Sequence, residues 1–150
     1  MRTRVIALGQ AAAGDDGVGF AVLEELHRRE IPPDVELLRA NDATDLMWLL
    51  PASANVVLVD AALGPSAGRV MVLDIAGLAR AGVQPVSSHG IGVREVVELA
   101  RLLSPERVGD SIRIVAIGIE QPERYRSALS PNVAAAIMRA ADRVLELAGG

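Results

Sequence analysis

The chain of 150 residues has no cysteine, which excludes disulfides, thiolate metal sites and cysteine nucleophiles. Aromatic residues make up only 2% of the chain, so its core must be built from valine, leucine, isoleucine and alanine. No apolar run approaches the length of a membrane span, and the apolar stretch at residues 5–8 is too short for the core of a signal peptide. We therefore expect a cytoplasmic protein without a membrane span.

Basic residues are interspersed with acidic ones and form no stripe that could follow a phosphate backbone, and the net charge is −4. Nucleic acid is therefore not an expected partner. The length is that of one ordinary domain, and hydrophobic residues make up 51% of the chain, enough to bury a sizeable core. We expect a single domain over residues 1–150 that acts as a monomer.

The hydrophobic pattern alternates between strand-like and helix-like segments. Short apolar runs predict buried strands at residues 4–8, 35–40, 55–60, 69–74 and 111–117. Apolar residues spaced three or four apart predict helices at residues 17–28, from a cap at Asn41 or Asp42 to Leu50, at 93–103, and from Ser130 to the C-terminal glycines. This alternation predicts a three-layer α/β domain whose sheet carries helices on both faces.

The sheet is predicted to have about five strands, most of them parallel. The strands at 55–60 and 69–74 are too close in sequence for a crossover helix between them. We therefore expect these two strands to pair antiparallel, which makes the sheet mixed.

The first predicted strand leads into a glycine-rich turn, LGQAAAGDDGVG. Gly9 and Gly14 have the spacing of a phosphate-binding GxxxxGKS loop, but Asp15 and Asp16 stand where that loop has a lysine and a hydroxyl. Two carboxylates repel a phosphate, and they favour a cation instead. The glycines suit a sharp bend that approaches a partner closely.

Three candidate site residues are predicted at one edge of the sheet. Asp16 follows the first strand, Asp60 ends the apolar run at 55–60, and His89 lies in a loop just before a helix. In open α/β sheets, ligands bind at the carboxyl ends of the strands, where helices also begin. Two carboxylates and an imidazole suit a divalent first-row metal or general acid–base chemistry.

Simpler structural roles compete with this site. Aspartates at a helix start are commonly caps, and an aspartate after a strand is commonly a turn former. Against this, Asp60 follows an unbroken apolar run, where a carboxylate needs a partner, and His89 is flanked by small residues that leave room for a ligand. The other histidine, His27, is expected at the surface near a helix end, with no role.

These residues resemble those of the hydrogenase maturation endopeptidases. That family has a motif close to GNxLxGDDGVG after its first strand, matched here by residues 9–19. It has an aspartate ending a buried strand, matched by LVDA at 58–61, and a histidine in a segment like SSHxxxL, matched by SSHGIGV at 87–93. Segments resembling IVAIGIEQP and LSPNV also match in the right order.

The resemblance implies a function for the three candidates. Members of the family remove a C-terminal extension from the large subunit of nickel–iron hydrogenases, and they are grouped with aspartic-type peptidases. By resemblance, Asp16, Asp60 and His89 bind nickel and form the catalytic site. The nickel belongs to the hydrogenase precursor and is sensed there, so it is not expected as a tightly bound cofactor.

Two other functions remain open. Gln10 replaces the usual asparagine, and the segment at 40–45 lacks the glycines that the family often shows. These departures favour, as an alternative, an inactive relative that binds a metal-loaded hydrogenase subunit without cutting it. A small-molecule hydrolase on a similar scaffold would need a deep pocket. We expect no GxSxG nucleophile elbow, which argues against a serine hydrolase.

Overall fold

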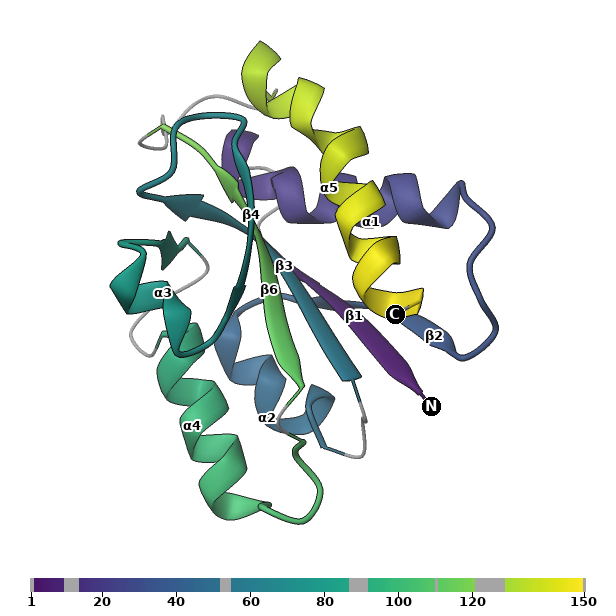
Figure 1. Ribbon diagram of the computed structural model, residues 1–150, viewed down its shortest axis with the longest axis vertical. Coiled ribbons are helices and arrows are strands. Elements are labelled where there is room, and N and C mark those ends of the chain that lie inside the picture. Colours follow the sequence, from purple (N-terminus) through teal and green to yellow (C-terminus); the bar gives the residue numbers. More distant parts are fainter. Residues whose placement is uncertain are drawn as a thin grey trace.

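The computed structural model describes residues 2–9, 14–51, 55–86, 92–109, 111–120 and 129–149 (Figure 1). The strands are β1 (Thr3–Leu8), β2 (Val35–Ala40), β3 (Asn55–Leu63), β4 (Val70–Asp74), β5 (Gln84–Pro85) and β6 (Ile112–Gly118). The α-helices are α1 (Val18–His27), α2 (Leu46–Leu49), α3 (Gly77–Arg80), α4 (Val93–Leu103) and α5 (Pro131–Gly149). Two 3-10 turns, η1 (Gly14–Gly17) and η2 (Ala43–Asp45), precede α1 and α2.

The six strands form one mixed sheet in the order β2-β1-β3-β6-β4, and the short β5 pairs with β3. β1 is parallel to β2 and β3, and β3 is parallel to β6. β4 runs antiparallel to β6, and β5 antiparallel to β3. The predicted α/β class with a mostly parallel mixed sheet is therefore confirmed, with the two-residue β5 as the additional strand.

The strands at 55–60 and 69–74 run in opposite directions, as predicted, but the predicted pairing between them is wrong. β6 lies between β3 and β4, so the antiparallel partner of β4 is β6. Burial explains the order, because β6 is buried at six of its seven positions, whereas every residue of β4 is partly or fully exposed. The strand with the larger buried surface takes the inner position, and β4 takes the edge.

The helices cover the sheet on both faces, as predicted. α1 and α5 pack against each other and against the face that carries Val57, Val59 and Ala61. α2 and α4 pack together on the opposite face, which carries Leu58 and Ala62. Figure 1 shows α5 and α1 on one side of the sheet and α2 and α4 on the other. The alternation along β3 thus divides the core into two apolar layers.

Most of the predicted helices form within one or two residues of the expected bounds. The helix expected up to Leu50 is divided into η2 and α2, and the Asp42 carboxylate caps it by accepting a 2.8 Å hydrogen bond from the Thr44 N–H. The short α3 was not predicted, and its first turn is held by a 2.6 Å hydrogen bond from the Gly77 N–H to Asp74 Oδ1. None of the helices in the described residues is long and apolar enough to cross a membrane.

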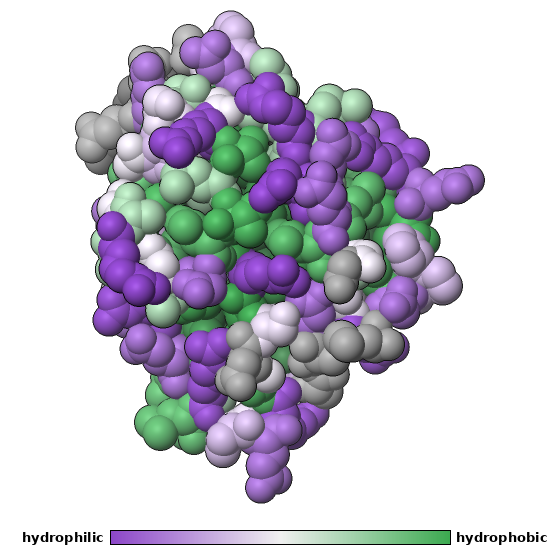
Figure 2. Space-filling model, viewed as in Figure 1, coloured by the Kyte–Doolittle hydropathy of each residue, from purple (hydrophilic) through white to green (hydrophobic). Residues whose placement is uncertain are grey.

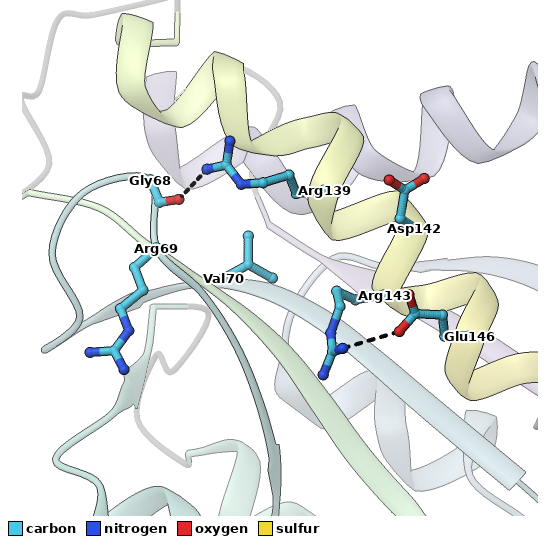
Figure 3. A pocket seen from close by; sticks show the side chains of 7 residues that line it. All are labelled: Gly68, Arg69, Val70, Arg139, Asp142, Arg143 and Glu146. Atoms are coloured by element: carbon cyan, nitrogen blue, oxygen red, sulfur yellow. Dashed lines mark hydrogen bonds and ion pairs between the residues drawn. The ribbon is translucent and has the colours of Figure 1, made fainter.

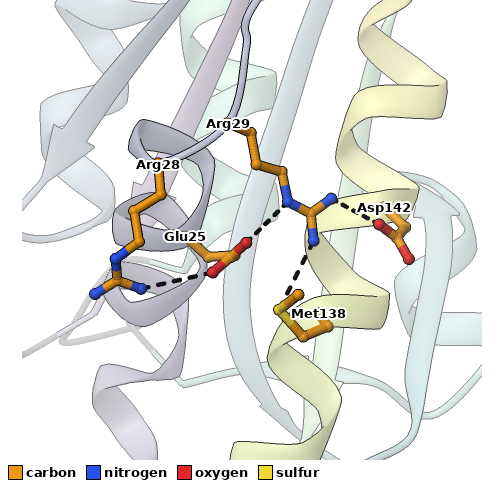
Figure 4. A network of polar contacts seen from close by, with 5 residues as sticks. All are labelled: Glu25, Arg28, Arg29, Met138 and Asp142. Atoms are coloured by element: carbon orange, nitrogen blue, oxygen red, sulfur yellow. Dashed lines mark hydrogen bonds and ion pairs between the residues drawn. The ribbon is translucent and has the colours of Figure 1, made fainter.

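A polar network joins α1 to α5 at the surface (Figure 4). Arg29 donates a 2.9 Å hydrogen bond to Glu25 and a 2.6 Å hydrogen bond to Asp142 on α5. The hydrogen bonds that Arg29 donates, first to Asp142 and then to Glu25, raise the pKa of its guanidinium above the ordinary value. The network therefore ties the C-terminal end of α1 to the middle of α5, the two helices that cover one face of the sheet.

Candidate functional site

The carboxyl ends of the parallel strands β1, β3 and β6 meet at one edge of the sheet, called here the carboxyl edge. The turn η1, which contains Asp15 and Asp16, comes after β1 and contacts β3. Val59 of β3 pairs with Ala7 of β1, so Asp60 lies level with Leu8, where β1 ends. The backbone of η1 and that of Asp60 are thus brought to the same edge.

Asp60, near the carboxyl edge, is a fully buried carboxylate. Its residue is 0% exposed, it shares a face of β3 with Leu58 and Ala62, and it pairs in register with Ala116 of β6. It also has a polar or electrostatic partner. Burial of an ionisable group among apolar residues costs free energy unless the group is paired. The partner of Asp60 therefore offsets the cost of burying its carboxylate.

The sequence predicted Asp60 to be the last residue of its strand, and this prediction is wrong. β3 continues for three more residues to Leu63, because Ala61 and Ala62 are also apolar and pair with β6. The same continuation gives β5 its partner, since Ala62 pairs with Pro85. Asp60 therefore has strand residues of β3 both before and after it in the sequence.

The other two predicted site residues are described less fully. The backbone of Asp16 lies in η1, and its side chain lies outside what the structure describes. His89 lies in residues 87–91, which are outside the described residues. Of the three, Asp60 alone has a described side chain, and no group of three His, Cys, Asp or Glu within the described part of the chain could hold a metal ion.

The described residues before His89 lie beside Asp60. The Val86 N–H donates a 3.0 Å hydrogen bond to the carbonyl of Ala61, the residue that follows Asp60. The chain thus enters residues 87–91 from the carboxyl edge. On the far side of this segment, α4 begins at the buried Val93, on the face of the sheet that Asp60 shares.

Asp15 has a partner that the sequence analysis missed. Its carboxylate accepts a 2.7 Å hydrogen bond from the Ser130 N–H and a 2.9 Å hydrogen bond from the Ser130 hydroxyl. Ser130 immediately precedes α5, so Asp15 joins η1 to the start of the last helix. The sequence indicated that Ser130 starts the last helix, but it could not indicate the contact with Asp15, because the two residues are 115 positions apart.

Gly19, at the end of the GDDGVG motif, allows α1 to approach the sheet closely. A Cβ at this position would lie 2.3 Å from the carbonyl oxygen of Leu8 and 2.9 Å from that of Val59. Neither distance leaves room for a side chain, so glycine is required by packing here. Leu8 ends β1 and Val59 precedes Asp60, so this contact fixes the helix start directly against the candidate site.

The turn between β3 and β4 reads Gly-Pro-Ser-Ala-Gly at residues 64–68, the Gly-x-Ser-x-Gly spacing of serine hydrolases. Its position is different from theirs, because it joins two strands instead of a strand and a helix. The Ser66 carbonyl accepts a 3.0 Å hydrogen bond from the Arg69 N–H. These residues have the spacing of the motif, but they form a strand-to-strand turn and not the strand-to-helix elbow of a serine hydrolase.

The profile of the HycI hydrogenase maturation proteases matches residues 20–147, which is well over half of the 150-residue chain. The chain belongs to the hydrogenase maturation protease family. The matched region contains Asp60 and His89 and begins immediately after the GDDGVG motif. The predicted family is therefore confirmed, and with it a peptidase that acts in hydrogenase maturation.

Solved structures of hydrogenase maturation proteases share the fold. The maturating endopeptidase HybD from E. coli superposes with a TM-score of 0.80 at 24% identity, covering 97% of this chain and 91% of that one. HybD from Thermococcus kodakarensis gives 0.79 at 22% identity, covering 99% of each chain. The hydrogenase 2 maturation peptidase of a Thaumarchaeota archaeon gives 0.64 at 26% identity, covering 99% of each. A search of curated protein sequences found no match.

Proposed function

We propose that this hydrogenase maturation protease removes the C-terminal extension from the precursor of a nickel–iron hydrogenase large subunit. In this proposal, Asp16, Asp60 and His89 contact the nickel that the precursor carries, and cleavage depends on that contact. The observation that carries the proposal is the buried Asp60, placed at the carboxyl edge level with the end of β1 and next to the residue that bonds Val86. The family match supplies the class of reaction.

The chemistry of the three side chains supports this assignment. Carboxylates and imidazole are ligands for divalent first-row metals. A nickel ion held jointly by precursor and protease would report that the metal has been inserted before the chain is cut. Hydrolysis itself adds one water across one peptide bond and leaves a new carboxylate and a new amine.

Three variants with matched controls test the proposal. Asp16→Asn and His89→Ala each remove a ligand, so cleavage of a nickel-loaded precursor should be lost. Asp34→Asn and His27→Ala make the same changes at exposed positions and should cleave like wild type. Asp60→Asn keeps the volume of a buried side chain, and it should abolish cleavage while costing about 1–3 kcal/mol in unfolding free energy.

The mass of the large subunit measures the outcome. Loss of the extension in wild type and in the control variants, but not in the three ligand variants, would support the proposal. Cleavage by Asp16→Asn and His89→Ala at the wild-type rate would rule out nickel sensing by these residues. If the wild-type protein binds the precursor stably but never cleaves it, the protein is instead the inactive relative that binds a hydrogenase subunit without cutting it.

A further inference from the structure

β4 is an edge strand with an exposed apolar surface. Its first four residues, Val70, Met71, Val72 and Leu73, are all partly exposed. Among the described residues β4 pairs with β6 alone, so no described strand covers its other edge, called here the open edge. Figure 2 shows apolar side chains gathered at the centre of the face on which Figure 1 draws β4, with hydrophilic residues around them. An open apolar edge of this kind is a template for pairing with another strand.

A bulge at the start of β4 determines which backbone groups face this open edge. Gly68, with φ at 86°, donates a 2.8 Å hydrogen bond to the Gly118 carbonyl, and the Gly118 N–H donates a 2.8 Å hydrogen bond to the Arg69 carbonyl. This is the pattern of a bulge with glycine in its first position. Along an antiparallel strand, the backbone N–H and C=O groups of successive residues point alternately toward the partner strand and away from it. Since Arg69 bonds to β6, the N–H and C=O groups of Val70 and Val72 point away from β6.

Within residues 70–73 the edge lacks the residues that protect such strands. Natural proteins block open edges with lysine, proline or inward charges, or they cover them. The sequence VMVL of residues 70–73 contains none of these residues, and the charge at Asp74 is engaged by the Gly77 N–H at 2.6 Å. A partner strand would satisfy the open groups of Val70 and Val72.

A groove of about 460 Å³ lies between the start of β4 and the outer side of α5 (Figure 3). Val70 lies in it, and its charged lining residues are Arg69, Arg139, Asp142, Arg143 and Glu146. The groove therefore adjoins the open edge on the face that α5 covers.

The charges of this groove are unequal. Asp142 is paired with Arg29 at 2.6 Å, and Glu146 is paired with Arg143 at 3.0 Å. Arg139 donates to the neutral carbonyls of Gly68 and Ala135, and Arg69 forms no ion pair with the described residues. Two guanidinium charges thus remain without a carboxylate in that part of the chain, although the protein as a whole is acidic at −4.

We propose that the open edge of β4 binds an extended, acidic segment of the hydrogenase precursor by strand addition. The apolar edge supplies main-chain hydrogen bonds, and Arg69 and Arg139 supply charge complementarity to carboxylate side chains on the segment. This inference rests on the proposed function, because the precursor is the occupant. A second copy of the chain is the competing occupant, and the experiment below distinguishes it.

The position of β4 relates this docking site to the candidate active site. Met71 pairs with Ala116 of β6, and Ala116 pairs with Asp60 of β3, so the three residues lie in one row across the sheet. A strand added outside β4 would lie three strand spacings from Asp60, or about 14 Å. An extended chain covers that distance in about four residues, so the docked segment should begin about four residues from the cleaved bond.

Amide hydrogen exchange tests the site with a defined probe. The probe is a synthetic ten-residue peptide of alternating glutamate and valine, and the control peptide has lysine in place of glutamate. With the acidic peptide, the amides of Val70 and Val72 should exchange at least tenfold more slowly, while those of Met71 and Leu73 should change little. Equal protection by the lysine peptide, or no protection at millimolar peptide, would overturn the proposal. So would protection that rises with protein concentration alone, which would identify a second copy.

Variants then link the edge to the precursor. Arg69→Glu reverses a charge at the edge, and Val72→Pro removes an N–H that points away from β6. Both should weaken precursor binding about tenfold, whereas Arg107→Glu, the same reversal on an exposed loop residue, should not. Wild-type affinity in both edge variants would overturn the docking site. A wild type that binds the precursor in this pattern without cutting it would contradict the proposed function and leave the docking site supported.

Discussion

The carboxylate of Asp15 connects the start of α1 to the start of α5 by accepting two hydrogen bonds from Ser130, at 2.7 Å from its N–H and 2.9 Å from its hydroxyl. The two aspartates of the GDDGVG motif therefore have different tasks. Asp15 is used for this internal contact, while its neighbour Asp16 is the one proposed to contact nickel. The contact holds the turn η1 in place at the carboxyl edge.

Removal of this contact should destabilise the protein. Asp15→Ala should lower the unfolding free energy by about 1–3 kcal/mol, because it leaves the Ser130 N–H and hydroxyl without their acceptor. Ser130→Ala should cost less, since the N–H still donates to Asp15. Urea unfolding of both single variants and the double variant measures the coupling between them. Strictly additive losses would show that the two side chains do not stabilise each other.

Gly19→Ala should be strongly destabilising despite the good helix propensity of alanine. Its Cβ would lie 2.3 Å from the Leu8 carbonyl oxygen, so α1 must move away from the sheet, at a cost of about 1–3 kcal/mol. Gly149→Ala is the matched control, because its Cβ meets nothing within 4 Å. Chemical denaturation compares the two, and equal unfolding free energies would contradict the close packing described here.

Asn55 should be sensitive to truncation, since it joins three strands and the last helix at the end of the sheet opposite the carboxyl edge. Its amide donates to Thr3 Oγ1 and to the Leu147 carbonyl, and its oxygen accepts a 2.9 Å hydrogen bond from Ser111. Asn55→Ala should cost about 1–3 kcal/mol, because partners at a buried site lose their hydrogen bonds. The exposed Asn41→Ala is the control, and thermal unfolding is the measurement.

The Arg29 network should contribute a small, salt-dependent stability that does not vary with pH near neutrality. The pKa of Arg29 is higher in the folded state than in the unfolded state. The stability that this shift contributes is complete at pH values below the unfolded-state pKa, and it is lost only as the pH rises through the folded-state pKa. Both values for arginine lie far above neutrality. Arg29→Met should therefore cost about 1 kcal/mol or less, equally at pH values of about 6 and 9. The loss should shrink in molar salt, and a loss that changed with pH would contradict this account.

The isolated, untagged protein should hold nickel weakly or not at all. Two carboxylates and one imidazole leave coordination positions that the precursor would have to supply. Titration calorimetry with nickel, and metal analysis of the purified protein, check this expectation. Stoichiometric nickel that survives dialysis would contradict the proposal that the metal belongs to the substrate.

The sequence was a good guide where the structural signal was local. The helix at 93–103 formed with the predicted bounds, because the apolar spacing that predicts it lies entirely within the segment. The placement of Asp60 at the carboxyl edge followed from the alternation of strands and helices. The burial of Asp60 followed from the apolar run before it.

The sequence was a poor guide where a partner lies far along the chain. The spacing between β3 and β4 indicated a short connection, but it could not show that β6 would be inserted between them. The bond from Ser130 to Asp15 spans 115 residues, which no periodicity can reveal. α3 and β5, with four and two residues, are too short to have a period. The convergence of Asp16 and His89 with Asp60 remains a prediction.

The inserted position of β6 has a consequence for how the protein is made. β3 and β4 are both synthesised before the strand that joins them, since β6 begins only at Ile112. Until that residue leaves the ribosome, β4 lacks the one strand with which it pairs in the described fold, and β3 lacks its neighbour on that side. The nascent chain therefore carries two open apolar edges while residues 75–111 are synthesised, a state that favours chaperone binding and aggregation. Completion of the sheet, and with it the enclosure of Asp60, is a late event of biosynthesis.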